Sequence, residues 1–276
     1  MIKYKIEDMT TNVTVTTRKG GEVNVDINVG SQLPYLRHGM QVLVMAHLNT
    51  PEMQVALSHV MDALRYQFPG ANFVLEMDYV PYGRQDRRCN AGEALGIKVF
   101  GAYINAMDFD AVMISDPHSD VTGACIERVE IIDQVDIFGK VHNFGAGWYI
   151  VAPDMGAKKK AEKFARETCA FGVITCYKER DMHTGEITSQ GIIGAENVPK
   201  GAKLFVLDDI CDGGRTFVGV RELLEQLEPE TVELAVTHGI FSYGTHVVAK
   251  VFDRVYTTAS WNPELKSEGN IEVVPL

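Results

Sequence analysis

The segment Lys203–Thr216, KLFVLDDICDGGRT, carries the residues whose types and spacing point most directly to chemistry. An apolar run leads into two adjacent carboxylates, Asp208 and Asp209, and a loop precedes an amphipathic run at Phe217–Leu227. The loop contains Asp212, Gly213, Gly214, Arg215 and Thr216. Loop amides and a helix N-terminus bind phosphate, and carboxylates bind ribose hydroxyls or a metal ion. The segment therefore predicts a site for a phosphorylated sugar, with an ordinary acidic and glycine-rich turn as the alternative.

A basic segment, Val80–Arg88, predicts a second anion site. Its sequence is VPYGRQDRR, and it places the guanidinium groups of Arg84, Arg87 and Arg88 just after a predicted strand. Guanidinium groups donate paired hydrogen bonds to phosphate oxygens, so the segment suits a polyphosphate. A solvated basic loop is the alternative.

Four shorter segments follow or end predicted strands. They are Ser115–His118, Ala152–Lys158, Lys178–Arg180 and Thr237–Ser242. Each is weak alone, because a single histidine is more often structural and Lys-Glu-Arg is a common surface triplet. In this order, and with the two longer segments, they resemble the motifs of the ribose-phosphate pyrophosphokinases, or phosphoribosyl-pyrophosphate synthetases. The resemblance extends from about Gly20 to the C-terminus, whereas type I phosphoribosyltransferases share only the Asp208 loop.

The resemblance implies a reaction and a donor site. In the family, the ribose 1-hydroxyl attacks the β-phosphorus of ATP, diphosphate moves to the sugar, and AMP leaves. Arg84, Gln85 and Asp86 are then expected to bind ATP. His118 and Asp154 are expected to place Mg²⁺, which prefers oxygen-rich sites.

The same resemblance assigns the catalytic residues and the acceptor site. Diphosphoryl transfer depends on positioning and on neutralising charge, and the family's Lys-x-Arg pair, here Lys178 and Arg180, is expected to stabilise the transferred group. His238 is expected to be structural. The expected ribose-phosphate site consists of Asp208, Asp209, Asp212, Gly213, Gly214, Arg215 and Thr216.

The chain departs from the family pattern around the nucleotide. The family has a Phe-x-Asp-Gly-Glu turn that a neighbouring subunit contributes to the adenine site, whereas this chain has Arg18–Glu22, without the aromatic residue and the acid. Cys89, Ala91 and Gly92 stand where the family carries further ATP ligands. We therefore expect the nucleotide to be held differently. The chain ends at Leu276, and we expect it to lack the family's final helix.

Two residues of the loop Asp212–Thr216 differ from the family pattern and suggest a different acceptor. Gly213 replaces the usual threonine, and Arg215 replaces the second glycine of the usual pair. We expect Gly213 to open space and Arg215 to add charge, which would suit a ribose with an extended 5-phosphate, such as ADP-ribose, in place of ribose 5-phosphate. A type I phosphoribosyltransferase and a non-catalytic regulatory relative are the other two classes considered.

Alternating strand-like and helix-like runs must position these segments. Strands are predicted at 42–46, 72–77, 111–115, 148–152, 171–176, 204–208 and 232–237, and helices at 53–66, 96–106, 157–168 and 218–227. This alternation favours an α/β fold with parallel sheets, whose ligands bind beyond the carboxyl ends of the strands. We expect two doubly wound parallel-sheet domains of the type I phosphoribosyltransferase-like fold. They are an ATP-contacting domain at 1–142 and a ribose-phosphate domain at 143–276, with the boundary near His142–Ala146.

Composition limits the function further. The net charge of −11 argues against nonspecific nucleic-acid binding. No apolar run approaches the roughly 20 residues of a membrane span, and the N-terminus lacks a signal-peptide core. The five scattered cysteines include no Cys-x-x-Cys pair, so neither zinc nor a disulfide framework is indicated. We expect a cytoplasmic homo-oligomeric enzyme that acts on small molecules and binds neither nucleic acid nor membrane.

Overall fold

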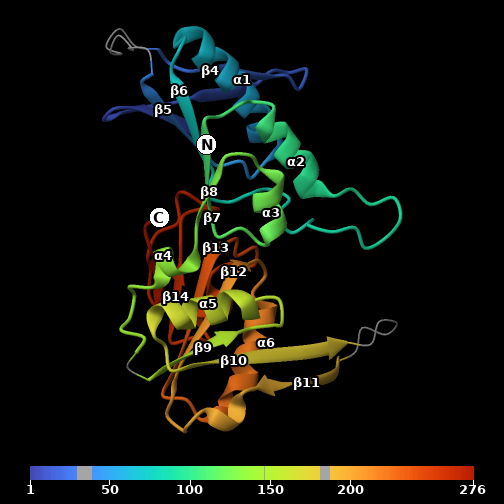
Figure 1. Cartoon of the computed structure of the whole chain (residues 1–276), viewed down its shortest axis with the longest axis vertical. Coiled ribbons are helices and arrows are strands. Elements are labelled where there is room, and N and C mark those ends of the chain that lie inside the picture. Colours follow the sequence, from blue (N-terminus) through green and yellow to red (C-terminus); the bar gives the residue numbers. More distant parts are fainter. Residues whose placement is uncertain (30–38, 146, 181–186) are drawn as a thin grey trace. The chain divides into compact units, whose positions relative to one another are not determined.

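The computed structural model describes residues 1–29, 39–145, 147–180 and 187–276, without the side chains of 178–180 and 187–188. The chain forms two compact units, Met1–Ile132 and Asp133–Leu276, and each is described by itself (Figure 1). Among the described helices, none has the length and apolarity to cross a membrane.

The N-terminal unit is built on a six-stranded sheet with the order β2-β1-β5-β6-β7-β8. Its strands are β1 (Ile2–Ile6), β2 (Met9–Asn12), β5 (Gln41–Ala46), β6 (Asn72–Glu76), β7 (Ala111–Ser115) and β8 (Val129–Ile132). Strands β5 to β8 are parallel, and β1 is antiparallel to both of its neighbours. A separate hairpin is formed by β3 (Thr14–Thr17) and β4 (Val23–Asp26).

Three helices connect the strands of this unit: α1 (Pro51–Gln67), α2 (Gly96–Asn105) and α3 (Asp120–Cys125). The hydroxyl of Thr50 caps α1 by accepting a hydrogen bond from the Met53 amide at 3.3 Å. Residues at helical spacing then form one buried face of α1: Ala56, Leu57, Val60, Met61 and Leu64. The apolar pattern thus fixes which side of α1 meets the core.

The C-terminal unit contains a seven-stranded sheet with the order β11-β10-β9-β12-β13-β14-β15. Its strands are β9 (Trp148–Ala152), β10 (Gly172–Arg180), β11 (Ile187–Ile193), β12 (Lys203–Cys211), β13 (Thr231–Gly239), β14 (Arg254–Thr257) and β15 (Ile271–Val273). Only β10 and β11 pair antiparallel among the strands of this sheet that the structure describes, and Figure 1 shows them as a long two-stranded ribbon. The helical segments are α4 (Gln134–Phe138), α5 (Lys158–Thr168), η1 (Ala195–Asn197), α6 (Arg215–Leu224), η2 (Glu225–Leu227) and α7 (His246–Ala249).

The α/β class with parallel sheets is confirmed, and the structure adds antiparallel strands that the sequence patterns did not predict. Both sheets are mixed, because β1 and β2 add an antiparallel edge to one sheet and β11 folds back on β10 in the other. Strand β12 also continues to Cys211, past the predicted end at residue 208. The two carboxylates therefore lie within the strand and not beyond it.

Packing around His142 explains why the C-terminal unit begins before this residue, at Asp133. The His142 ring stacks on Trp148 with centroids 4.3 Å apart, and its Nε2 lies 2.5 Å from a carboxylate oxygen of Glu233 on β13. Phe144 packs edge-on against Phe205 of β12 at 4.9 Å. The segment before β9 thus belongs to the C-terminal core. The domain limits at 142 and 143 stay a prediction.

Candidate active site

Asp208 and Asp209 lie near the carboxyl end of β12, a central strand of the C-terminal sheet. The backbone of Asp208 pairs with Val236 of β13. Asp209 is 6% exposed, and its amide donates a hydrogen bond to Oδ1 of Asp208 at 3.0 Å. Because both neighbouring strands are buried apolar runs, the position of this pair is fixed by the sheet.

The charges of Asp154 and Lys160 influence this carboxylate pair. Asp154 follows β9, and its Oδ1 accepts hydrogen bonds from the amides of Gly156 and Ala157 at 2.8 and 3.0 Å. Lys160 of α5 places Nζ 3.8 Å from Oδ2 of Asp209. Burial, then the charge of Asp209, and then that of Asp154 raise the pKa of Asp208 well above its usual value. Crowded carboxylates of this kind suit a divalent cation or sugar hydroxyls.

The phosphate loop turns from β12 into α6 through Gly214. This residue has φ +78°, a conformation that side chains disfavour, and an added β-carbon would lie 3.0 Å from Cγ1 of Val247. The positive φ therefore favours glycine, and Val247 leaves little room for a larger residue. The turn lets α6 begin at Arg215, with Arg215 and Thr216 exposed in its first turn. The amides there are oriented as an anion site requires.

A second loop, residues 240–244, fastens onto the phosphate loop. The amides of Ile240 and Phe241 donate to the Cys211 carbonyl at 2.9 and 3.1 Å. Ser242 bonds Asp212 twice, through its amide to the carbonyl at 3.1 Å and through its hydroxyl to Oδ1 at 2.7 Å. Asp212 is thereby held by protein contacts, which orient it within the loop.

Tyr243 projects from this second loop over Gly213. A β-carbon at Gly213 would lie only 2.9 Å from the Tyr243 ring, so the expectation that Gly213 opens space is wrong. The ring occupies that space because the neighbouring contacts pin its loop. The guanidinium carbon of Arg215 lies 5.7 Å from the centroid of the Tyr243 ring, so the added charge at Arg215 pairs with an aromatic face.

In the N-terminal unit, the Arg84 segment forms a turn beyond β6. Tyr82 has φ +62°, packs on Phe100 with ring centroids 5.7 Å apart, and donates from its hydroxyl to Gln54 at 3.1 Å. These contacts anchor the turn, whereas Arg84 and Gln85 are exposed. The turn therefore presents a guanidinium group and an amide from a fixed base.

His118 lies beside this turn. It is half-buried in the loop after β7, and a β-carbon on Gly83 would lie 3.7 Å from its Cβ. Burial raises the pKa of Asp86, but the hydrogen bond and charge of Arg87, followed by the charge of His118, outweigh burial and hold that pKa below its usual value. The predicted ATP residues and His118 are thus brought together by the sheet.

The stretch after Arg88 is a compact, self-bonded turn. The carboxylate of Glu93 accepts hydrogen bonds from the amides of Cys89 and Asn90 at 2.8 and 3.0 Å, and Arg88 donates to the Glu93 carbonyl at 3.1 Å. These contacts occupy the place where the family was expected to carry further ATP ligands.

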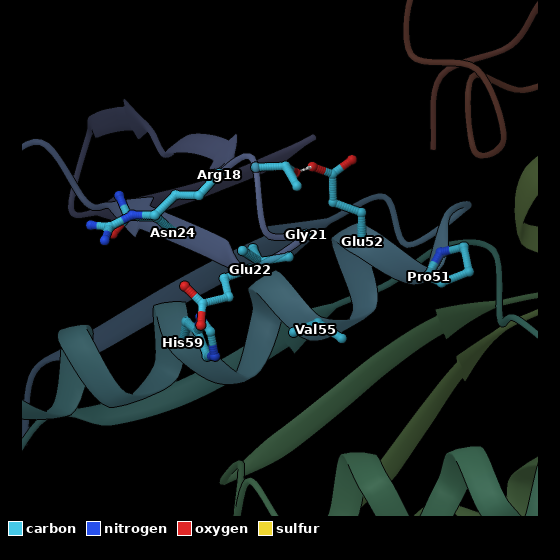
Figure 2. A pocket seen from close by; sticks show the side chains of 10 residues that line it. Arg18, Gly21, Glu22, Asn24, Pro51, Glu52, Val55 and His59 are labelled. Carbon is cyan, nitrogen blue, oxygen red and sulfur yellow. Dashed lines mark hydrogen bonds between the residues drawn. The ribbon is translucent and has the colours of Figure 1, made fainter.

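The Arg18–Glu22 turn caps the β3–β4 hairpin and borders a groove of about 860 Å³ over α1. Figure 2 shows the carboxylate of Glu22 directed toward the His59 ring of α1. The sequence analysis treated this turn only as a lost adenine contact and missed the groove. The exposed Val55, one helical turn before His59, lines this groove.

Some predicted site residues belong to different units or lie outside the described side chains. His118 lies in the N-terminal unit and Asp154 in the C-terminal unit, so each is described only within its own unit. Lys178 and Arg180 lie on β10, but their side chains are outside the described part of the chain. Over the described residues, no group of three or more His, Cys, Asp or Glu side chains is arranged to hold a metal by itself.

The sequence analysis also missed two residues and proposed one structural histidine. Lys160 follows the quoted Ala152–Lys158 segment by two positions, and Tyr243 directly follows Thr237–Ser242, so each lay just beyond a recognised motif. His238 is 2% exposed and lies 2.8 Å from the Ser260 hydroxyl, as expected of a structural residue.

Comparisons with known proteins agree with this architecture. A family profile for the phosphoribosyl transferase domain matches residues 142–262. A ribose-phosphate pyrophosphokinase of Saccharolobus solfataricus is 32% identical over 58% of this chain, and one of Sulfolobus acidocaldarius is 25% identical over 81%. The matches span 55% and 75% of those relatives.

A solved structure supports the fold over nearly the whole chain. The crystal structure of phosphoribosylpyrophosphate synthetase from Mycobacterium smegmatis matches with a TM-score of 0.79, covering 98% of this chain and 88% of that one, at 20% identity. The resemblance found in the motifs is therefore confirmed by sequence and by fold. The chain is therefore similar to the ribose-phosphate pyrophosphokinases, and its residues 142–262 match the phosphoribosyl transferase domain.

Proposed function

We propose that this protein is a ribose-phosphate diphosphokinase. It transfers the β,γ-diphosphate of ATP to the 1-hydroxyl of ribose 5-phosphate and releases phosphoribosyl pyrophosphate and AMP. The observation that carries the proposal is the carboxylate pair Asp208 and Asp209 set beside a glycine turn at the start of α6, in a relative of enzymes bearing that name.

The acceptor half of the reaction is assigned to the C-terminal unit. Amides of the phosphate loop, Asp212–Thr216, bind the 5-phosphate, because their turn is fixed by Gly214. Asp208 and Asp209 accept hydrogen bonds from the ribose hydroxyls. A preformed site of this kind holds the sugar in one orientation, which lowers the entropic cost of the reaction.

The donor half is assigned to the N-terminal unit. Arg84 and Gln85 bind the ATP phosphates and base from the anchored turn, and Asp86 orients Arg87 by the 3.0 Å ion pair. Lys178 and Arg180 neutralise the charge that builds on the diphosphate as the bond to AMP breaks. The proton of the attacking hydroxyl passes to solvent or to a carboxylate of the acceptor site.

Asp154, Asp208 and Asp209 carry the oxygen ligands that Mg²⁺ prefers, and phosphate oxygens of the bound substrates would complete its coordination. Repulsion among Asp154, Asp208 and Asp209, which raises the pKa of Asp208, would be relieved by a divalent cation, and all three offer oxygen ligands. His118 would contribute from the donor side. When bound, Mg²⁺ supplies charge neutralisation of the phosphate oxygens.

The direct test is to incubate the purified protein with ATP, Mg²⁺ and ribose 5-phosphate and to measure AMP and phosphoribosyl pyrophosphate. Equal amounts of both products are expected. Ligand binding without AMP release from any ribose phosphate would favour the regulatory class. Consumption of phosphoribosyl pyrophosphate with a free nucleobase, and no AMP from ATP, would favour a phosphoribosyltransferase.

A further inference from the structure

We propose that Tyr243 and Arg215 form a recognition surface for acceptors in which the ribose 5-phosphate is joined through a second phosphate to a nucleoside. The inference rests on the proposed function, since it refines the acceptor of the same site. It concerns a residue, Tyr243, that none of the sequence motifs included.

The position of Tyr243 is set by its neighbours on both sides. Ser242 is tied to Asp212 by two hydrogen bonds, and the Gly244 amide donates to the Phe241 carbonyl at 2.7 Å. Phe241 and Gly244 have positive φ values of 48° and 87°, which make the chain reverse sharply around Tyr243. The backbone at Tyr243 is therefore fastened directly to the phosphate loop.

The ring itself is open to solvent although it lies against that loop. Tyr243 is 61% exposed, so much of its side chain is accessible to a ligand. One edge contacts the loop at Gly213, where an added β-carbon would lie 2.9 Å from the ring and would require the ring to shift. Glycine at 213 thus serves to admit the ring, and the ring leaves a face available to a ligand.

Arg215 supplies the matching charge. Its guanidinium lies 5.7 Å from the ring centroid, and its residue is the first of α6, next to the amides proposed to bind the 5-phosphate. Asp212, the nearest carboxylate in sequence, is engaged by Ser242. An anion placed just beyond the 5-phosphate would therefore meet a cation that an aromatic face already orients.

These features match an extended acceptor better than a terminal one. Ribose 5-phosphate fills the loop and has no group that reaches beyond its phosphate. A second phosphate would pair with Arg215, and an attached base has a flat face that stacks on Tyr243. An exposed aromatic ring can still stack with a base.

The test is equilibrium binding in the absence of ATP, measured calorimetrically on the full-length protein with ADP-ribose and ribose 5-phosphate as probes. We expect ADP-ribose to bind more tightly. Tyr243→Ala should weaken ADP-ribose binding about tenfold, a typical loss for one base–aromatic stack, and leave ribose 5-phosphate binding unchanged. Tyr243→Phe, which keeps the ring, should retain the preference.

The outcomes separate the proposal from its alternatives. Tighter ADP-ribose binding in Tyr243→Ala would show that the ring is a barrier to extended acceptors, and equal or absent losses for both probes would show that it has no selective role; either result overturns the proposal. Thermal unfolding of each variant shows whether a loss of binding results from misfolding. If Tyr243→Ala does not fold, Tyr243→Phe, which keeps the ring, is compared with Tyr243→Leu, which lacks it. AMP release from ATP is measured in parallel. If neither acceptor yields AMP, the diphosphokinase assignment fails, while the binding ratio still decides the role of Tyr243.

Discussion

In the C-terminal unit the carboxylates Asp208 and Asp209 lie near the end of a central strand of the sheet, whereas in the N-terminal unit Arg84 and Gln85 lie on an exposed turn. Asp209 is 6% exposed, and the backbone of Asp208 is held by its pairing with β13. Arg84 and Gln85 are exposed and depend on Tyr82 for their anchor. Under the proposed function, this difference favours a preformed acceptor site and a donor site that is completed when ATP binds.

The largest effect on activity is expected from removing the charge of Lys178. Lys178→Ala should lower the rate of AMP release by about 10²–10³, the usual cost of removing one group that stabilises transition-state charge. The matched control is Lys140→Ala, an exposed lysine in the same unit. Steady-state assays with both substrates saturating provide the measurement, and a rate equal to that of the control would remove the catalytic assignment of Lys178.

The rigidity of the acceptor site is tested by Gly214→Ala. Gly201 offers a matched control, since its φ of +75° is similar but a β-carbon there meets nothing within 4 Å. Both variants should lose about 1 kcal/mol of unfolding free energy from backbone strain. Gly214→Ala should lose more, because of Val247, and should also bind ribose 5-phosphate about tenfold more weakly, the equivalent of ~1.4 kcal/mol. Denaturant unfolding and calorimetry measure the two effects. Identical behaviour of the variants would contradict a steric requirement at Gly214.

The more adaptable donor site should respond through affinity. Arg84→Ala removes one charged contact to phosphate, and we expect the KM for ATP to rise about tenfold with little change in stability, because the side chain is exposed. Arg128→Ala, which removes an exposed arginine of the same unit, serves as the control. No change in the KM for ATP would exclude Arg84 from the donor site.

The smallest effect is a pH-dependent gain in stability. Because the folded protein raises the pKa of Asp208, it favours the protonated form, and this contribution is present below the unfolded pKa and is lost as pH rises through the folded pKa. Asp208→Asn should therefore raise the Tm at pH 7 in the absence of Mg²⁺ and leave it unchanged near pH 3. Each kcal/mol gained in the free energy of unfolding should raise the Tm by about 2–4 °C. Asp253→Asn, at a carboxylate that accepts backbone bonds away from the site, should not stabilise. Excess Mg²⁺ should reduce the gain.

The sequence was sufficient for elements whose pattern is local. The apolar runs at β7 and β9 and the helical face of α1 follow from residue spacing alone, and their positions were confirmed. The continuation of β12 beyond Asp208 was missed, because polar residues in a central strand depend on pairing with β13, which spacing does not reveal. The antiparallel edge strands were missed for the same reason.

The candidate site was predictable where a motif carried it. The phosphate loop is recognisable from consecutive residues, and the need for glycine at 214 follows from its turn. The contact of Tyr243 with Gly213 joins segments that are 30 positions apart, as does the bond between Ser242 and Asp212. The space expected at Gly213 was therefore filled by a residue that only the tertiary structure brings there.

The central claim is that the acceptor binds to the C-terminal unit and the donor to the N-terminal unit, and the most direct test is the rate of AMP release with both substrates varied. Arg84→Ala should raise the KM for ATP alone, and Gly214→Ala should raise the KM for ribose 5-phosphate alone. The reverse pattern, or an equal rise of both KM values in each variant, would contradict this division of the site.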